Sequence, residues 1–104
     1  MERIAKIIRL KPEAIDEYKK IHADVWPGVR AMIAKCHIRN YSIFLREPEN
    51  LLFAYFEYHG TDFEADMARM AQDETTQRWW KITDPMQTSL ETATEGEWLS
   101  LIHI

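Results

Sequence analysis

Cysteine and long apolar runs are scarce in this sequence. Its 104 residues include one cysteine, Cys36, so the chain cannot close an internal disulfide, and such sparse use of cysteine is typical of a reducing compartment. No apolar run approaches the roughly 20 residues that a membrane-spanning helix needs. Residues 1–10 mix charged with apolar side chains and do not resemble a signal peptide. These absences favour a cytoplasmic protein that acts without a membrane partner.

An excess of basic residues and a supply of glycine are missing too. The chain has 13 Lys and Arg against 17 Asp and Glu, a formal net charge of −4, so we expect no nucleic-acid partner. Its three glycines form no phosphate-binding loop, and its four histidines show no metal-ligand spacing. The residues therefore predict chemistry that needs neither a metal nor a cofactor.

The composition that is present is that of a folded domain. Hydrophobic residues make up 46% of the chain and charged residues 29%, which is ordinary for a globular protein. A chain of this length has room for one domain with its own core. Residues 1–104 are therefore expected to form a single domain.

The spacing of apolar residues predicts the element order βαββαβ. Strands are expected where β-branched and aromatic residues gather, at residues 3–10, 38–46, 51–58 and 97–102. Helices are expected where apolar residues recur three and four apart or follow a capping residue, at residues 13–25, 29–35, 61–71 and 73–82. Residues 86–96 are mostly polar and predict a surface loop. This order indicates an α+β protein with a ferredoxin-like sandwich.

One predicted strand is apolar on both sides. Residues 51–56 form a near-continuous apolar run, which is typical of a strand that is covered on both faces. The helices can cover only one face, and in so short a chain a second subunit is the natural cover for the other. We therefore predict a homodimer in which two sheets pack face to face as a dimeric α+β barrel.

Tyr18 and His22 are the most informative pair of polar residues. They lie four residues apart on the apolar stripe of a predicted helix, so their side chains are neighbours and point inward. One interpretation is a hydrogen bond within the core and no further role. The other is a pocket wall in which His22 moves protons, because an unperturbed histidine titrates near pH 6.5.

The aromatic residues allow a similar choice. Trp79 and Trp80 are adjacent on a helix, so they point about 100° apart and only one of them can pack fully in the core. The other can line a cleft, where an indole face suits the C–H face of a sugar ring. Tyr41 follows Asn40 at the start of a strand, and only one of these two side chains should join a given pocket. Trp26 and Trp98 are expected to pack. The residues alone thus predict a pocket for a neutral, polar small molecule.

The chain also resembles the L-rhamnose mutarotase family. The resemblance rests on five short stretches spread over nearly the whole length: Glu17-Tyr18 with His22, Val25-Trp-Pro27, Asn40-Tyr-Ser-Ile43, Asn50-Leu-Leu-Phe-Ala54 and Gln77-Arg-Trp-Trp-Lys81. It implies a homodimeric α+β barrel and an isomerase that interconverts the α and β anomers of L-rhamnose without metal or organic cofactor. Residues 83–87 and the polar residues 88–96 match the family less clearly, and they concern the pocket rim.

The resemblance also implies roles for particular residues. His22 resembles the family's proton donor, and Tyr18, Tyr41, Trp79 and Trp80 resemble its sugar-binding residues. We expect His22 to protonate the ring oxygen during opening and to recover that proton on closure, opposite Tyr18, a water molecule or another group. Two other functions fit the same scaffold. A cofactor-free monooxygenase would consume oxygen, and a non-catalytic sugar-binding module would bind sugar equally well without the imidazole.

Overall fold

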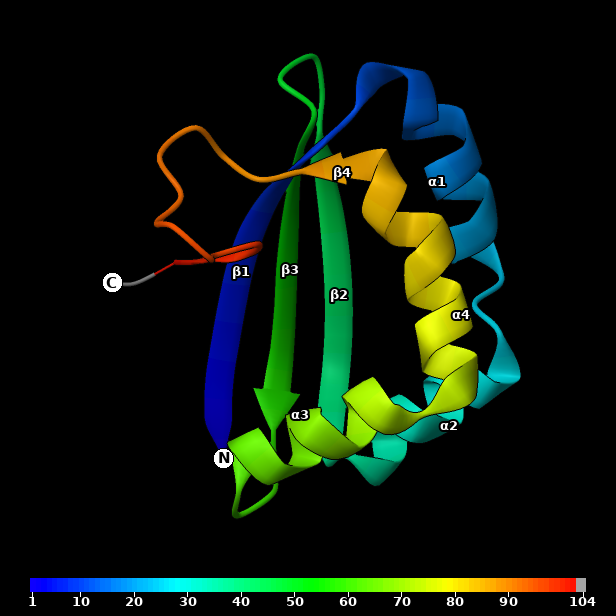
Figure 1. Cartoon of the computed structure of the whole chain (residues 1–104), viewed down its shortest axis with the longest axis vertical. Helices are drawn as coiled ribbons and strands as arrows, with labels where there is room; N and C mark the ends of the chain where they lie inside the picture. Colours follow the sequence, from blue (N-terminus) through cyan, green and yellow to red (C-terminus); the bar gives the residue numbers. More distant parts are fainter. Residues whose placement is uncertain (103–104) are drawn as a thin grey trace.

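The computed structural model describes residues 1–102 and contains one antiparallel sheet (Figure 1). The three long strands are β1 (Glu2–Leu10), β2 (Ile38–Arg46) and β3 (Leu51–Tyr58), and the two short ones are β4 (Gln87–Thr88) and β5 (Ser100–Leu101). Their order is β2-β3-β1-β4, and β5 also pairs with β1. The expected α+β fold is confirmed, with β1 and β3 at the centre as a ferredoxin-like sandwich requires.

Four α-helices connect these strands. They are α1 (Ile15–Ala23), α2 (Pro27–Lys35), α3 (Phe63–Gln72) and α4 (Glu74–Thr83), and single 3₁₀ turns occupy Pro12–Ala14 and Asp84–Met86. Pro27 opens α2 because a proline lacks the backbone N–H that the first helical turn leaves unpaired. Asp62 and Asp73 accept hydrogen bonds from the N–H groups of Ala65 and Thr76 and so cap α3 and α4.

The C-terminal part differs from the sequence-based prediction. The loop expected at residues 86–96 contains strand β4, which pairs with Arg9 and Leu10 of β1. The strand expected at residues 97–102 is only β5, because the Glu97 carboxylate accepts hydrogen bonds from Thr94 N–H and Ser100 Oγ and holds a turn there. Two-residue edge strands carry too little apolar pattern to be found in a polar segment. The first helix is also shorter than expected, because residues 12–14 form the 3₁₀ turn.

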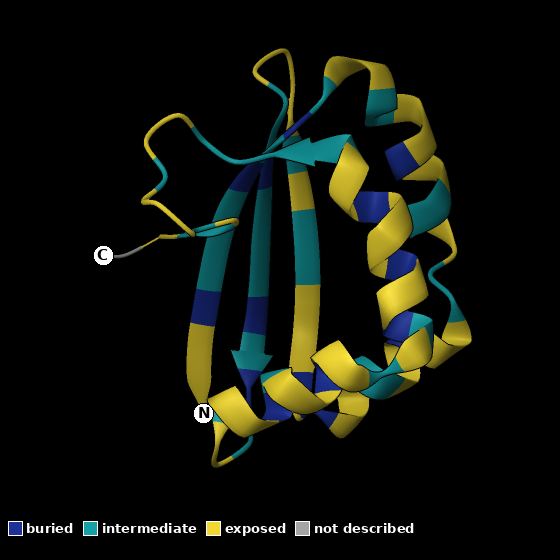
Figure 2. Ribbon diagram, in the orientation of Figure 1, coloured by how far each residue is buried: buried dark blue, intermediate teal, exposed yellow. Residues whose placement is uncertain are grey.

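The helices cover one face of the sheet, which we call the inner face (Figures 1 and 2). Two core clusters form there. The first joins Ile4, Ile38 and Phe56 of the sheet to Met70 of α3, and the second joins Ile8, Leu10 and Leu52 to Tyr18 of α1. Between the clusters, at the middle of β1, the two layers enclose the cavity described below.

The opposite, outer face carries an apolar row across three strands. Ile7, Phe53 and Phe44 are cross-strand neighbours on this face, and no helix lies over them. Phe44 lies on the edge strand β2 and has 62% of its surface exposed, which is high for a phenylalanine. The next row toward one end has Arg9 and Arg46 on either side of Leu51, and the next row toward the other end consists of Ala5, Tyr55 and Ser42.

Candidate functional site

A cavity of about 840 Å³ lies between the inner face of the sheet and the helices. All four helices contribute to one wall, and β1, β2 and β3 supply the other. The residues predicted from the sequence all line this cavity: Tyr18, His22, Tyr41, Trp79 and Trp80. A volume of this size accommodates a monosaccharide together with bound water.

Tyr18 and His22 form the α1 side of the cavity. The helix places them one turn apart, and their rings stack with centroids 3.9 Å apart and planes 20° apart. Tyr18 is only 6% exposed, whereas His22 is half-buried. Burial raises the pKa of the Tyr18 phenol, the nearby Tyr41 phenol raises it further, and a hydrogen bond from the Gln87 side chain lowers it. Tyr18 therefore stays protonated and can donate a hydrogen bond at every physiological pH.

The His22 ring has a defined proton position. Its Nδ1 lies 2.9 Å from the Tyr18 carbonyl oxygen, and because a carbonyl can only accept, Nδ1 carries the proton. The neutral ring then has its acceptor lone pair on Nε2. Burial lowers the pKa of His22, although the bond to the Tyr18 backbone partly opposes this. At neutral pH the imidazole is thus a base whose free nitrogen is Nε2.

Trp79 and Trp80 lie as their spacing predicts, one buried and one exposed. Trp79 on α4 is 6% exposed and meets two rings edge-on, that of His22 at 5.3 Å and that of Trp26 at 5.1 Å between centroids. Trp26 therefore packs behind Trp79, as expected. Trp80 lines the cavity with part of its surface and faces solvent with the rest.

Tyr41 reaches the cavity through an irregularity in β2. The pairing of β2 with β3 shifts between Arg39 and Ser42, so Asn40 and Tyr41 both lie opposite Phe56 as a β-bulge. Asn40 adopts a left-handed backbone with φ of 53°, and its amide donates to Glu57 Oε1 at 2.9 Å. Tyr41 stacks on Phe56 with centroids 5.4 Å apart, and the surrounding protein raises the pKa of its phenol. Both residues line the cavity, whereas strand alternation had predicted only one.

Sequence reasoning missed several other lining residues. Trp98, which was expected to pack, is 43% exposed and lines the cavity. Gln87 and Asp84 come from the stretch that matched the family less clearly, and burial raises the pKa of Asp84. Lys6 enters from the centre of β1. The inward position of Lys6 was available from strand alternation, because Ile4 and Ile8 flank it two residues away on either side.

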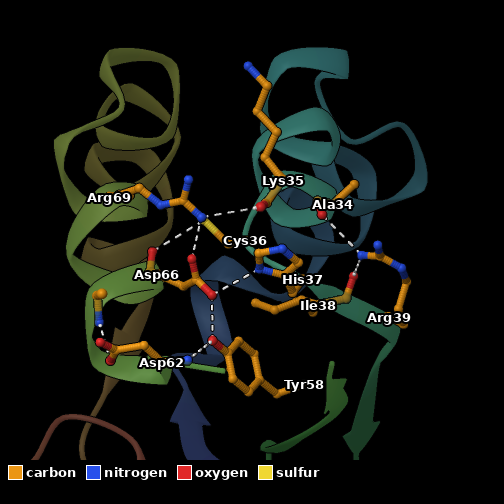
Figure 3. A network of polar contacts seen from close by, with 11 residues as sticks. Ala34, Lys35, Cys36, His37, Ile38, Arg39, Tyr58, Asp62, Asp66 and Arg69 are labelled. Atoms are coloured by element: carbon orange, nitrogen blue, oxygen red, sulfur yellow. Dashed lines mark hydrogen bonds and ion pairs between the residues drawn. The ribbon is translucent and has the colours of Figure 1, made fainter. Parts of the chain in front are cut away.

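A second polar cluster lies at the other end of the inner face, around Asp66 of α3 (Figure 3). The Asp66 carboxylate accepts hydrogen bonds from the Tyr58 hydroxyl, from His37 Nδ1 at 3.0 Å and from the Arg69 guanidinium. These donors hold the pKa of Asp66 at about 2. The thiol of Cys36 donates to the Asp66 carbonyl at 3.2 Å. We call this the Asp66 network; it does not line the cavity.

Residues 1–102 hold neither a metal-ligating cluster nor a membrane-spanning helix. No three His, Cys, Asp or Glu side chains within that range come together as a metal-ligating group. None of the helices there is long and apolar enough to cross a membrane. The chemistry that the cavity residues can perform by themselves is proton transfer through His22 and hydrogen bonding through phenols, amides and Lys6.

Comparisons with known proteins show what this chain is similar to in sequence and in fold. A family model described as L-rhamnose mutarotase matches residues 3–104. The L-rhamnose mutarotase of Listeria monocytogenes is 39% identical over 89 residues, which cover 86% of this chain and 83% of that protein. The L-rhamnose mutarotase of Bacillus subtilis is 37% identical over 86 residues, which cover 83% of this chain and 80% of that protein.

The structure also has a solved relative. The crystal structure of an L-rhamnose mutarotase from Formosa agariphila superimposes with a TM-score of 0.76 at 22% sequence identity. The match covers 100% of this chain and 95% of that one. At this identity the likeness supports the fold alone.

Proposed function

This chain belongs to the L-rhamnose mutarotase family, and on that premise we propose that it interconverts the α and β anomers of L-rhamnopyranose. It would then be an isomerase that acts on a carbohydrate. The observation that carries the proposal is the placement of His22. Its Nδ1 is fixed by the Tyr18 carbonyl, which leaves Nε2 to exchange a proton inside a cavity walled by tyrosines and tryptophans.

The reaction requires two proton transfers in each direction. Ring opening breaks the bond between the anomeric carbon and the ring oxygen. The anomeric hydroxyl loses its proton and becomes the carbonyl oxygen, while the ring oxygen gains a proton. Rotation about one C–C bond turns the other carbonyl face toward the hydroxyl, and the same two transfers run backwards to close the ring. Protons and electrons balance without any redox partner.

In this proposal His22 is the base that opens the ring. Burial lowers the pKa of His22, so the ring is neutral at pH 7 and Nε2 accepts the anomeric proton first. The imidazolium then returns a proton on closure, which makes His22 the proton donor of that half-reaction. This reverses the order of transfers that the sequence-based hypothesis assigned to His22. A general base of this kind contributes typically 10²–10⁴-fold.

Tyr18 is the group best suited to the opposite transfer. Its raised pKa keeps the phenol protonated, so it can donate toward the ring oxygen while His22 accepts from the anomeric hydroxyl. The two rings are stacked on one helix and held 3.9 Å apart, so their polar tips reach one small ligand from the same wall. Tyr41, Trp79 and Trp80 are proposed to bind the sugar through hydrogen bonds and ring faces.

We further propose that the working form is a homodimer joined through the outer face. The row formed by Ile7, Phe53 and Phe44 is apolar, and the row beside it has arginines at both ends, as the core and rim of a protein interface do. Phe44→Glu should convert a dimer into a monomer in size-exclusion chromatography with light scattering. Ile82→Glu, which changes an exposed apolar residue of α4 instead, should leave the dimer intact. A wild-type chain that is monomeric at all concentrations contradicts this part of the proposal.

The cytoplasmic location predicted from the sequence stays a prediction that cell fractionation would test.

The activity is tested by saturation-transfer NMR between the two anomeric protons of equilibrated L-rhamnose. We expect wild-type protein to accelerate the exchange and His22→Ala to lose at least about 100-fold of that acceleration. His59→Ala is the matched control, because His59 is exposed, its ring pairs with Glu57, and it does not line the cavity. Acceleration by His22→Ala equal to wild type would remove His22 from the chemistry. No acceleration by wild type would reject the mutarotase activity, and oxygen uptake would then test the monooxygenase alternative.

A further inference from the structure

Lys6 interrupts an apolar row at the centre of the sheet. Its neighbours on the inner face of β1 are Ile4 and Ile8, which are buried in the first and the second core cluster, respectively. Lys6 therefore lies in the gap between the clusters, where it lines the same cavity as Tyr18 and His22. Its cross-strand neighbours are Ala54 on β3 and Leu101 on β5, whose side chains offer no hydrogen-bond acceptor.

The ammonium of Lys6 has no protein partner within residues 1–102. None of the ion pairs there includes Lys6, and Nζ donates to no side chain or carbonyl in that range. An ammonium carries three donors and no acceptor, and it is costly to leave these donors without oxygen atoms. Because Lys6 is only half-buried, water or a ligand in the cavity can supply these acceptors.

The other charges of the cavity do not neutralise Lys6. Two further cations, Arg30 and Arg39, line the walls, against the single carboxylate of Asp84. The guanidinium of Arg39 is engaged by the carbonyls of Ala34 and Ile38, each at 3.0 Å. The cavity is thus electropositive within a chain of net charge −4. Such a site favours ligands that present oxygen acceptors.

We propose that Lys6 is a further substrate-binding residue, whose Nζ donates a charge-assisted hydrogen bond to a hydroxyl oxygen of the sugar. This inference rests on the proposed function. Because Lys6 is paired with Ala54 of β3 on one side and with Leu101 of β5 on the other, the lysine stem starts from a fixed point in the sheet. A bound sugar thereby has one hydroxyl held against the sheet while His22 and Tyr18 act from the helix. A site that hydrogen-bonds a particular hydroxyl rejects analogues that lack it, so Lys6 also sets specificity.

The test compares Lys6→Met with wild type over a range of L-rhamnose concentrations in the anomeric-exchange experiment. Methionine keeps the unbranched stem and removes the charge. We expect the KM to rise about tenfold or more, as for loss of a hydrogen bond from a charged group, while kcat changes much less. Lys20→Met removes the same charge from the exposed side of α1 and should leave KM and kcat unchanged. Equal melting temperatures for the two variants show that the fold is intact.

The outcomes separate this inference from the proposed activity. If wild type accelerates exchange and Lys6→Met has a KM within twofold of wild type, Lys6 does not bind the sugar. If wild type accelerates nothing, the mutarotase activity fails, and binding of L-rhamnose is measured by tryptophan fluorescence instead. Weaker binding by Lys6→Met then supports Lys6 as a sugar-binding residue. Equal binding by both proteins, or no binding by wild type, overturns the inference.

Discussion

The two polar regions of the inner face satisfy their hydrogen bonds in opposite ways. In the Asp66 network, one carboxylate that is 6% exposed receives donors from Tyr58, His37 and Arg69. In the cavity, His22 donates from Nδ1 to the Tyr18 carbonyl of its own helix, which leaves Nε2 without a partner among the described residues. Lys6 donates to no protein acceptor in the same part of the chain. Every fully buried polar side-chain atom in residues 1–102 has a partner, so the polar groups with spare hydrogen-bonding capacity there are ones that reach the cavity or solvent.

This difference separates stability from function. The buried Asp66 carboxylate is costly to leave without its donors, although the side chains of Arg69 and His37 are themselves half-exposed. Groups with open hydrogen-bonding capacity contribute little to folding and are available to a ligand. The two regions share the same sheet face and similar residue types, yet the first should control the melting temperature and the second the reaction.

Reciprocal substitutions test this separation with the largest effects. His22→Gln should lose about 10²–10⁴-fold of the exchange rate, because the amide cannot act as an acid or base, and should keep the melting temperature within about 2 °C. Asp66→Asn should lower the melting temperature by roughly 10 °C, because Arg69 and His37 lose their anionic partner, and should keep activity within about twofold at low temperature. NMR exchange and thermal denaturation by circular dichroism measure both properties. If either variant loses both exchange activity and thermal stability, the assignment of stability to one region and of activity to the other is wrong.

The two regions also differ in how far the sequence predicts them. Tyr18, His22 and Trp79 were found because they are close in sequence or carry rare side chains on an apolar stripe. The bounds of β2 and β3 followed from apolar, β-branched and aromatic residues on either side of a clear turn signal at residues 47–50. Asp66 looks like an ordinary exposed helical residue, because its partners Tyr58 and His37 are distant in sequence and only the fold joins them. The same holds for strand β4 and for the bulge at Asn40, both of which depend on pairing between distant segments.

Tyr18→Phe probes the cavity alone with a smaller effect. The substitution removes the phenol proton but keeps the ring that stacks on His22, so the Nδ1 bond to the residue 18 carbonyl persists. We expect kcat for anomeric exchange to fall roughly 10–100-fold, because water can replace the phenol as a poorer donor. Tyr55→Phe is the control, since the hydroxyl of Tyr55 bonds to Glu57 outside the cavity. An unchanged kcat in Tyr18→Phe would mean that a group other than Tyr18 donates the proton to the ring oxygen.

Activity and stability should depend on pH in different ranges, because the two regions titrate differently. The pKa of His22 is lowered from its ordinary 6.5, and a base must be neutral, so activity should be full above about pH 6.5 and fall about tenfold per unit below the lowered pKa. The pKa of Asp66 is held at about 2, below its ordinary 3.8, so its folded state favours the carboxylate. That contribution to stability is complete above about pH 4 and is lost as the pH falls toward 2. Exchange rates and circular dichroism from pH 8 to 2 should therefore show activity failing before the fold does.

Gly60→Ala offers the smallest and most local way to disturb the Asp66 network. A Cβ at residue 60 would collide with the Tyr58 hydroxyl and come within 2.8 Å of Asp66 Oδ2, so the short bond between these two groups must open. We expect the melting temperature to fall by a few degrees, since one hydrogen bond is weakened while Arg69 and His37 keep Asp66 paired. Gly28→Ala is the matched control, because its added Cβ meets the side-chain methyl of Thr75 instead. The kcat and KM of Gly60→Ala should equal those of wild type, because residue 60 does not line the cavity. A change in KM without a loss of stability would mean that the two regions are coupled through β3, the strand that carries Tyr58 at one end and Leu52 at the other.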